Sequence, residues 1–77
     1  SPDGRTILYS MAVNGNTDIY RIPAAGGTPV RLTNSPGIDV GGSFSPDGTR
    51  IVFESDRSGS QQLYVMSADG SNQQRIS

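Results

Sequence analysis

The sequence contains no cysteine and no histidine, and lysine and tryptophan are absent as well. Without cysteine and histidine the chain can form no disulfide, and it offers no metal-binding cluster of the usual spacing. Glu54 is the only glutamate, and the serines have no histidine or lysine that could act as a base. The glycine pairs do not open a helix in the manner of a phosphate-binding loop. The composition therefore predicts no catalytic residue, no metal site and no cofactor.

Long hydrophobic runs and clusters of one charge sign are also missing. Apolar runs such as residues 7–9 and 51–53 are far shorter than the ~20 residues of a transmembrane helix. Six arginines oppose seven acidic residues, the net charge is −1, and the two signs are scattered along the chain. A nucleic-acid surface would instead concentrate positive charge. We expect neither membrane insertion nor nucleic-acid binding.

An internal repeat is the most informative feature that is present. Ser1-Pro2-Asp3-Gly4 returns as Ser45-Pro46-Asp47-Gly48, and this offset of 44 residues aligns residues 1–33 with residues 45–77 without a gap. A period of about 40–45 residues that holds several short strands is typical of a β-propeller blade. The paired positions keep their chemical type, as in Ile7/Ile51, Leu8/Val52, Tyr9/Phe53, Gly15/Gly59, Ile19/Leu63, Tyr20/Tyr64, Ala24/Ala68, Gly26/Gly70, Arg31/Arg75 and Leu32/Ile76.

Alternation and turn residues predict strands at residues 6–11, 18–22 and 29–33 in the first copy. The second copy has an additional strand at residues 37–44, whose Gly41-Gly42 pair suits the crowded inner strand of a blade, followed by a strand at residues 50–54. The predicted fold class is all-β, with four-stranded antiparallel β-propeller blades and about two blades of a larger ring. Residues 1–33 are expected to form an incomplete blade with strands two to four, and residues 34–77 a complete blade with its inner strand.

Further blades are the expected partners of this chain. Only 32% of its 77 residues are hydrophobic, which is little to offset the conformational entropy lost on folding. An open pair of blades would also leave apolar faces and strand edges uncovered. We expect the missing blades to come from the same polypeptide or from a homo-oligomer such as a trimer, which would close a ring of six blades.

Proline, aspartate and glycine mark the predicted turns. Proline presets φ, glycine accepts positive φ, and aspartate accepts hydrogen bonds from backbone N–H groups two residues further on. Asp3 and Asp47 allow a second interpretation, a metal or acid–base pair formed where adjacent blades bring them together, but the turn role is preferred. The predicted structural turn residues are Pro2, Asp3, Gly4, Pro46, Asp47, Gly48, Asp69 and Gly70.

Aromatic residues at strand centres are predicted to pack between blades, because sheet-on-sheet packing buries large side chains there. These residues are Tyr9, Tyr20, Phe53 and Tyr64. The alternative is that they line a groove for a peptide.

Several charged residues have more than one possible role. Asp39, on the predicted inner strand, either caps a strand end or faces the channel, where a cation or water could bind. Asp56 and Arg57 are expected to pair with each other, or with a neighbouring blade, in a solvated loop. Arg31 and Arg75 occupy equivalent outer strands, where they either oppose edge-to-edge pairing, which is preferred, or form a ligand-facing row.

Five short motifs of the second copy identify a known type of repeat. They are Phe44-Ser45-Pro46-Asp47-Gly48, Arg50-Ile51-Val52-Phe53, Ser55-Asp56-Arg57, Leu63-Tyr64-Val65-Met66 and Asp69-Gly70. With these motifs the second copy closely resembles the repeat of the TolB-type, WD-repeat-like β-propeller family. The first copy matches more loosely, because Met11-Ala12-Val13 stands where the second copy has Ser55-Asp56-Arg57.

The resemblance implies a non-catalytic scaffold for protein–protein interaction, with a protein or peptide partner, in the periplasm or outside a bacterial cell. Two alternatives remain open. One is the gating propeller domain of a prolyl-oligopeptidase-like serine hydrolase, whose chemistry would lie on another domain. The other is a designed repeat unit, which the regular spacing of 44 residues favours. Analogy at the level of the fold does not choose among them.

Overall fold

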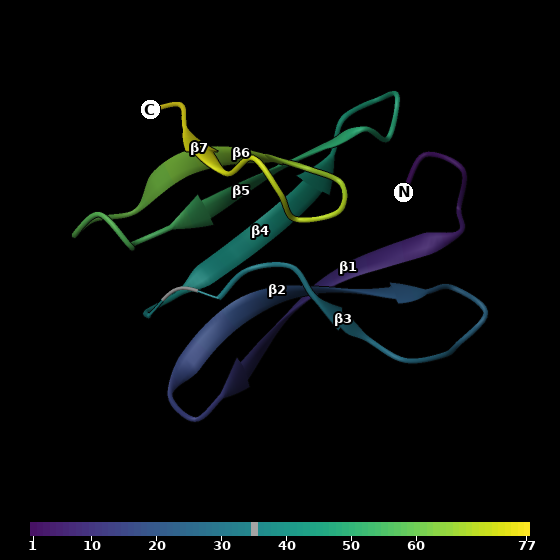
Figure 1. Ribbon diagram of the computed structural model, residues 1–77, viewed down its shortest axis with the longest axis horizontal. Helices are drawn as coiled ribbons and strands as arrows, with labels where there is room; N and C mark the ends of the chain where they lie inside the picture. The colour runs from purple at the N-terminus through teal and green to yellow at the C-terminus, as the bar shows by residue number, and fades with distance from the viewer. Residues whose placement is uncertain (35) are drawn as a thin grey trace.

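A computed structural model describes residues 1–34 and 36–77 of the chain. The first sheet contains β1 (Thr6–Val13), β2 (Asn16–Pro23) and β3 (Val30–Arg31). The second contains β4 (Asp39–Phe44), β5 (Arg50–Ser55), β6 (Gln62–Ser67) and β7 (Gln74–Arg75). Each sheet is an antiparallel meander in chain order (Figure 1). The predicted all-β fold class is confirmed, and the seven strands among these described residues match the predicted number. The proposed blade boundary at residues 33 and 34 stays a prediction, and Ser35 lies outside the described residues.

The first hairpin is longer than the sequence predicts. Strand β1 continues to Val13, and its register with β2 runs without interruption from Thr6 opposite Pro23 to Val13 opposite Asn16. Asn14 and Gly15 close the hairpin with φ of 53° and 83°, the positive values that a two-residue turn needs. The outer strand β3 is shorter than predicted, because only Val30 and Arg31 pair with β2.

The glycine pair of the inner strand forms a β-bulge, in addition to its expected role of reducing side-chain bulk. The register of β4 on β5 shifts between Val40 and Ser43, and Gly41 has a φ of 72° that side chains rarely adopt. Strand β4 lies close to the first sheet at Gly42, where an added Cβ would be in ordinary van der Waals contact, 3.5 Å from side-chain atoms of Ile19 and Leu8.

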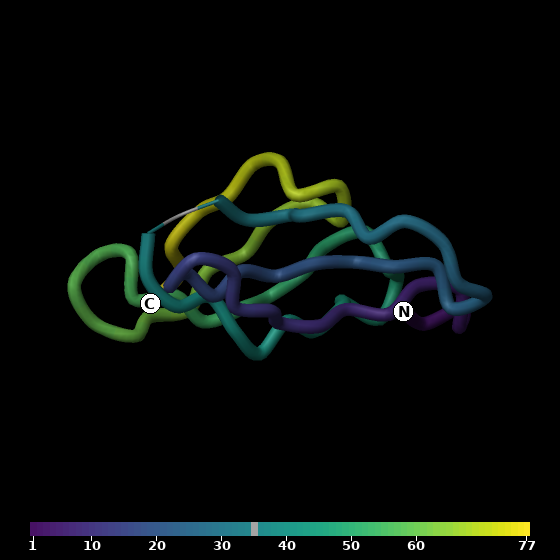
Figure 2. Tube along the Cα trace, turned by 90° about the horizontal axis from the view of Figure 1, so that it is seen from below, coloured from purple at the N-terminus to yellow at the C-terminus, as the bar shows by residue number. Residues whose placement is uncertain are grey.

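The hydrophobic core lies between the two sheets, in a flat body of 35 × 28 × 17 Å (Figure 2). Strand β4 lies beside both β1 and β2, and the backbone N–H of Thr17 donates to the Gly37 carbonyl at 2.9 Å. Ile19 and Leu32 of the first repeat pack into this core. Their partners from the second repeat are Ile51, Phe53, Tyr64 and Met66, with Leu8 and Phe44 at the margin.

Candidate functional site

The two Ser-Pro-Asp-Gly turns have the same geometry. In the second copy, Asp47 Oδ1 accepts hydrogen bonds from the Ser45 hydroxyl at 2.6 Å and from the Thr49 backbone N–H at 3.0 Å. Asp3 accepts equivalent bonds from Ser1 Oγ at 2.6 Å and from the Arg5 N–H at 3.0 Å. These hydrogen bonds lower the pKa of both carboxyls, and the bond from the serine hydroxyl has the largest effect. The pKa of Asp47 is lowered to about 2.

Asp69 orders the β6–β7 turn in the same way. It accepts the N–H of Ser71 at 2.9 Å and its hydroxyl at 2.5 Å, and these bonds lower its pKa. The next residue, Gly70, passes so close to the first sheet that an added Cβ would lie 2.8 Å from the Leu32 carbonyl oxygen. The three turn carboxylates therefore hold loops, and in the part of the chain that the structure describes no three potential ligand residues gather to bind a metal ion.

The four predicted packing aromatics form two pairs. Phe53 and Tyr64 stack with centroids 5.7 Å apart and belong to the core between the sheets. Tyr9 and Tyr20 stack at the same 5.7 Å. Their strand positions correspond to those of Phe53 and Tyr64, but they are not members of the inter-sheet core cluster.

The expectation that Asp56 and Arg57 pair in a solvated loop is wrong. Arg57 instead forms an ion pair with Asp39 at 3.2 Å, and its guanidinium lies 5.3 Å from the Phe53 ring centre and 4.8 Å from that of Tyr64. Asp39 is fully buried and also accepts the Ser55 hydroxyl, so its side chain closes a polar network instead of facing a channel. Asp56 accepts the N–H of Ile38 at 2.9 Å.

This buried network also bridges the two repeats. Arg57 donates to the side-chain oxygen of Gln73 at 2.7 Å. The Gln73 amide then donates to the Leu32 carbonyl at 3.1 Å. The inner strand, the β5–β6 loop and the neighbouring repeat are thus joined by one chain of charged and polar contacts.

Arg31 makes specific contacts on its outer strand, and the expected role of Arg31 and Arg75 against edge-to-edge pairing stays a prediction. Its Nη2 contacts the buried Asp18 at 2.5 Å, and its Nε donates to the Thr33 carbonyl at 2.9 Å. Arg75 repeats the second contact with the carbonyl of Ser77. No ligand-facing row of arginines is needed to explain either position.

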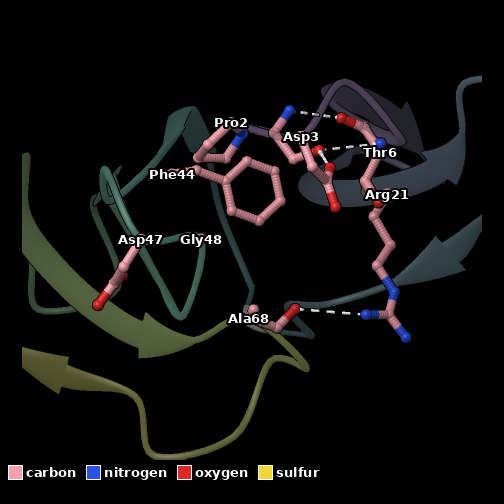
Figure 3. Close-up of a pocket in the computed structure, with 9 residues that line it drawn as sticks. Pro2, Asp3, Thr6, Arg21, Phe44, Asp47, Gly48 and Ala68 are labelled. Carbon is pink, nitrogen blue, oxygen red and sulfur yellow. Dashed lines mark hydrogen bonds between the residues drawn. The ribbon is translucent and has the colours of Figure 1, made fainter.

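A cleft of about 220 Å³ opens between the two repeats (Figure 3). Arg21 of β2 reaches across it, and its Nη1 lies 3.5 Å from the carbonyl oxygen of Ala68. The Phe44 ring lies at the centre of the view, below Pro2. The residues lining the cleft are Ser1, Pro2, Asp3, Thr6, Arg21, Phe44, Asp47, Gly48 and Ala68.

Arg21 is the cleft residue that sequence reasoning missed. Its counterpart one repeat later is Val65, so the repeat itself does not require an arginine there, and this difference was the available signal. Guanidinium donors beside an aromatic ring and a proline suit recognition of a protein surface. The hydroxyl–carboxylate pair in the lining, Ser1 and Asp3, belongs to the turn hydrogen bonds described above.

Two successive antiparallel meanders of three and four strands, their Asp-centred turns and the core between the sheets define a β-propeller module. A family model described as the TolB beta propeller domain matches residues 1–77. The chain belongs to this family. No helix long and apolar enough to cross a membrane occurs among residues 1–34 and 36–77.

Relatives with similar sequences and structures are much longer than this chain. Uncharacterized protein Atu1656 of Agrobacterium fabrum is 38% identical over 76 residues, which cover 99% of this chain and 26% of that protein. The Tol-Pal system protein TolB of Bordetella pertussis is 49% identical over 55 residues, which cover 70% of this chain and 13% of that protein.

Two solved structures confirm the fold. An Agrobacterium tumefaciens protein assigned to TolB superimposes with a TM-score of 0.94 at 38% identity, covering 100% of this chain and 28% of its own. TolB of Acinetobacter baumannii superimposes with a TM-score of 0.89 at 36% identity. The match covers 100% of this chain and 19% of the Acinetobacter chain.

Proposed function

We propose that the chain is a non-catalytic, protein-binding part of a TolB-like propeller in the bacterial periplasm. The match of the family model to residues 1–77 carries this proposal. The relatives named TolB belong by name to the Tol-Pal system, and a periplasmic location follows from that likeness. A scaffold role also agrees with a site whose carboxylates are held by turn hydrogen bonds.

The cleft between the repeats is the proposed docking site. Propellers bind through surface residues that the scaffold does not need, and Arg21 is such a residue, because Val65 takes its place in the second repeat. Its guanidinium makes a single long contact of 3.5 Å with a backbone carbonyl. It can therefore exchange that contact for a stronger bond to a partner.

The test is a titration of the isotopically labelled chain with the soluble domain of the Pal lipoprotein of Bordetella pertussis, followed by NMR. We expect shifts centred on the cleft and a dissociation constant that rises about tenfold or more in Arg21→Ala. Arg50→Ala, which changes another arginine outside the cleft, is the matched control and should bind as the unaltered chain does.

A folded chain that shows no shifts with this Pal domain would refute the choice of partner. If the Arg21→Ala and Arg50→Ala variants lost affinity for the Pal domain equally, the assignment of the docking site to the cleft would be refuted. A nucleophile motif Gly-x-Ser-x-Gly followed by a histidine elsewhere in the parent polypeptide would instead support the hydrolase-gating alternative.

A further inference from the structure

The tip of the β1–β2 hairpin carries an asparagine followed by a glycine. Asn14 and Gly15 are both exposed, and the tip projects from the body of the molecule at the lower left of Figure 1. Their counterparts one repeat later, Ser58 and Gly59, are exposed as well, although the first sheet packs against the second at the core. The exposure of this tip therefore follows from its place in the repeat and does not depend on which sheet lies beside it.

This pair has the residue types that allow a spontaneous reaction with the peptide backbone. The side-chain amide of an asparagine can be attacked by the backbone nitrogen of the following residue, which is one reason why asparagine is thermolabile in proteins. The side chain of the following residue normally hinders this attack. Gly15 has no side chain, so its nitrogen reaches the Asn14 amide with the least hindrance that any residue offers.

Asn72 provides a comparison within the same chain. Asn14 and Asn72 are both exposed, with φ of 53° and 56°. The amide nitrogen of Asn72 donates to the Ser67 hydroxyl at 3.2 Å, and the residue after Asn72 is Gln73, whose own side chain donates to two backbone carbonyls. Asn14 has neither restraint, because in the described part of the chain no hydrogen bond holds its side chain and a glycine follows it.

The Asp-Gly pairs of the repeat turns, which could undergo a related reaction, are restrained by hydrogen bonds. The carboxylates of Asp3, Asp47 and Asp69 each accept a serine hydroxyl and a backbone N–H. These bonds lower the pKa of the three carboxyls and keep them ionised, and an ionised carboxylate is a poor electrophile. The nitrogens of the three following glycines are also occupied, since each donates to a backbone carbonyl within its turn.

The residues that follow the tip hold the connection between the two repeats. The register of β1 with β2 ends where Val13 lies opposite Asn16. Asn16 Oδ1 accepts the Gly37 N–H at 3.3 Å, and the N–H of Thr17 donates to the Gly37 carbonyl at 2.9 Å. A change in the length of the backbone at the tip would therefore disturb the segment that leads into β4.

We propose that Asn14 is a site of spontaneous deamidation, and that its conversion to isoaspartate opens the hairpin tip and loosens the connection between the repeats. The Gly15 nitrogen bonds to the side-chain carbonyl carbon of Asn14. Its proton passes through solvent to the side-chain nitrogen, which leaves as ammonia. Water then opens the resulting cyclic imide at either carbonyl and gives aspartate or isoaspartate. Isoaspartate adds a methylene group to the main chain, which a tight hairpin turn does not accommodate. This inference does not depend on the proposed protein-binding role.

The test follows the full chain during incubation in mildly alkaline buffer. Trimethylamine N-oxide keeps the chain folded, as circular dichroism will show, and a parallel sample is unfolded in urea. Peptide mapping with electron-transfer dissociation distinguishes asparagine, aspartate and isoaspartate at each position. We expect the rate at Asn14 in the folded chain to lie within about tenfold of the rate in urea, because loop tips open at little cost in free energy. Asn72 and the three Asp-Gly pairs should remain unmodified in the folded chain.

Two variants at the same position separate the reaction from its structural consequence. Asn14→Ser copies the Ser58-Gly59 pair of the second repeat and has no amide to lose, so this position should stay unmodified during incubation. Asn14→Asp has the same added negative charge as the deamidated chain but lacks the additional methylene group. In hydrogen exchange measured by NMR, the N–H of Thr17 should exchange faster in the isoaspartate form than in Asn14→Asp.

Three results would contradict the proposal. A folded chain that keeps the Asn14 amide while the chain in urea loses it would overturn the proposal, because the turn would then protect the site. Modification of Asn72 or Asp47 as fast as Asn14 in the folded chain would show that hydrogen bonds and the following residue do not select the site. Equal exchange of the Thr17 N–H in the isoaspartate form and in Asn14→Asp would refute the loosened connection.

Discussion

Replacing Arg57 with methionine should destabilise the chain by about 3 kcal/mol. The change removes the guanidinium from Asp39, a fully buried carboxylate whose Oδ2 lies 3.2 Å from Arg57 Nη2. Removing one partner of a buried ion pair costs about 3–5 kcal/mol. We expect the lower end of this energy range because the Arg57 side chain is 22% exposed and the Ser55 hydroxyl still donates to Asp39. Methionine keeps an apolar side chain near the Phe53 and Tyr64 rings, which limits the loss of packing.

The assay is urea unfolding followed by circular dichroism at a fixed chain concentration, because association would make stability depend on concentration. A fixed amount of trimethylamine N-oxide keeps both proteins folded at the start of the titration. Arg75→Met is the control. Arg75 donates to the backbone oxygen of exposed Ser77, so its loss should change stability by less than about 0.5 kcal/mol.

A double variant separates the charge effect from packing. Asp39→Asn combined with Arg57→Met removes both charges, so it should recover about 1–2 kcal/mol of the loss seen for Arg57→Met alone. A loss for Arg57→Met that matches the Arg75→Met control would refute the argument. A double variant less stable than Arg57→Met would show that packing over the rings, rather than the buried charge, dominates.

Gly70→Ala should cost about 2–4 kcal/mol and Gly26→Ala only about 1–2 kcal/mol. Both residues have positive φ, 91° and 97°, but only at Gly70 does an added Cβ lie 2.8 Å from the Leu32 oxygen; equal urea midpoints would contradict this. The Asp47 carboxyl should titrate with a pKa of about 2 in a carbon-detected NMR titration. Folding lowers this pKa below its ordinary 3.8. The turn therefore contributes stability above about pH 4, and this contribution is lost as the pH falls through about 2. An unshifted pKa would rule out the hydrogen bonds assigned to the turn. Gly42→Leu should destabilise by about 1–3 kcal/mol while Gly42→Ala stays near neutral, since the added Cβ meets its neighbours at an ordinary 3.5 Å; a tolerated leucine would show that the inner strand is not closely packed.

Local signals predicted the number and order of the strands of this chain. The Asp3 and Asp47 turns follow from a short segment in which proline, aspartate and glycine each have one local task. The strand ends were less accurate, because β1 extends to Val13 and β3 begins at Val30. Pairing across the hairpin, rather than the composition of either strand, sets those limits.

The candidate site was harder to predict, because its residues meet only when two repeats pack. Nothing near Arg57 in the sequence indicates Asp39, which lies on the inner strand, or Gln73, which lies beyond β6. Arg21 faces the second repeat because strand alternation places it on the same side as Ile19, but the cleft beside Ala68 exists only between sheets.

The sequence alone established the repeat, the all-β class and the turn chemistry, because spacing and backbone preference act over a few residues. Tertiary structure decided burial. Ile7 and Ile51 are the same residue at the same repeat position, yet one is 50% exposed and the other 0%. The difference arises because burial depends on which sheet lies opposite a side chain, and a neighbouring sheet covers Ile51 but not Ile7.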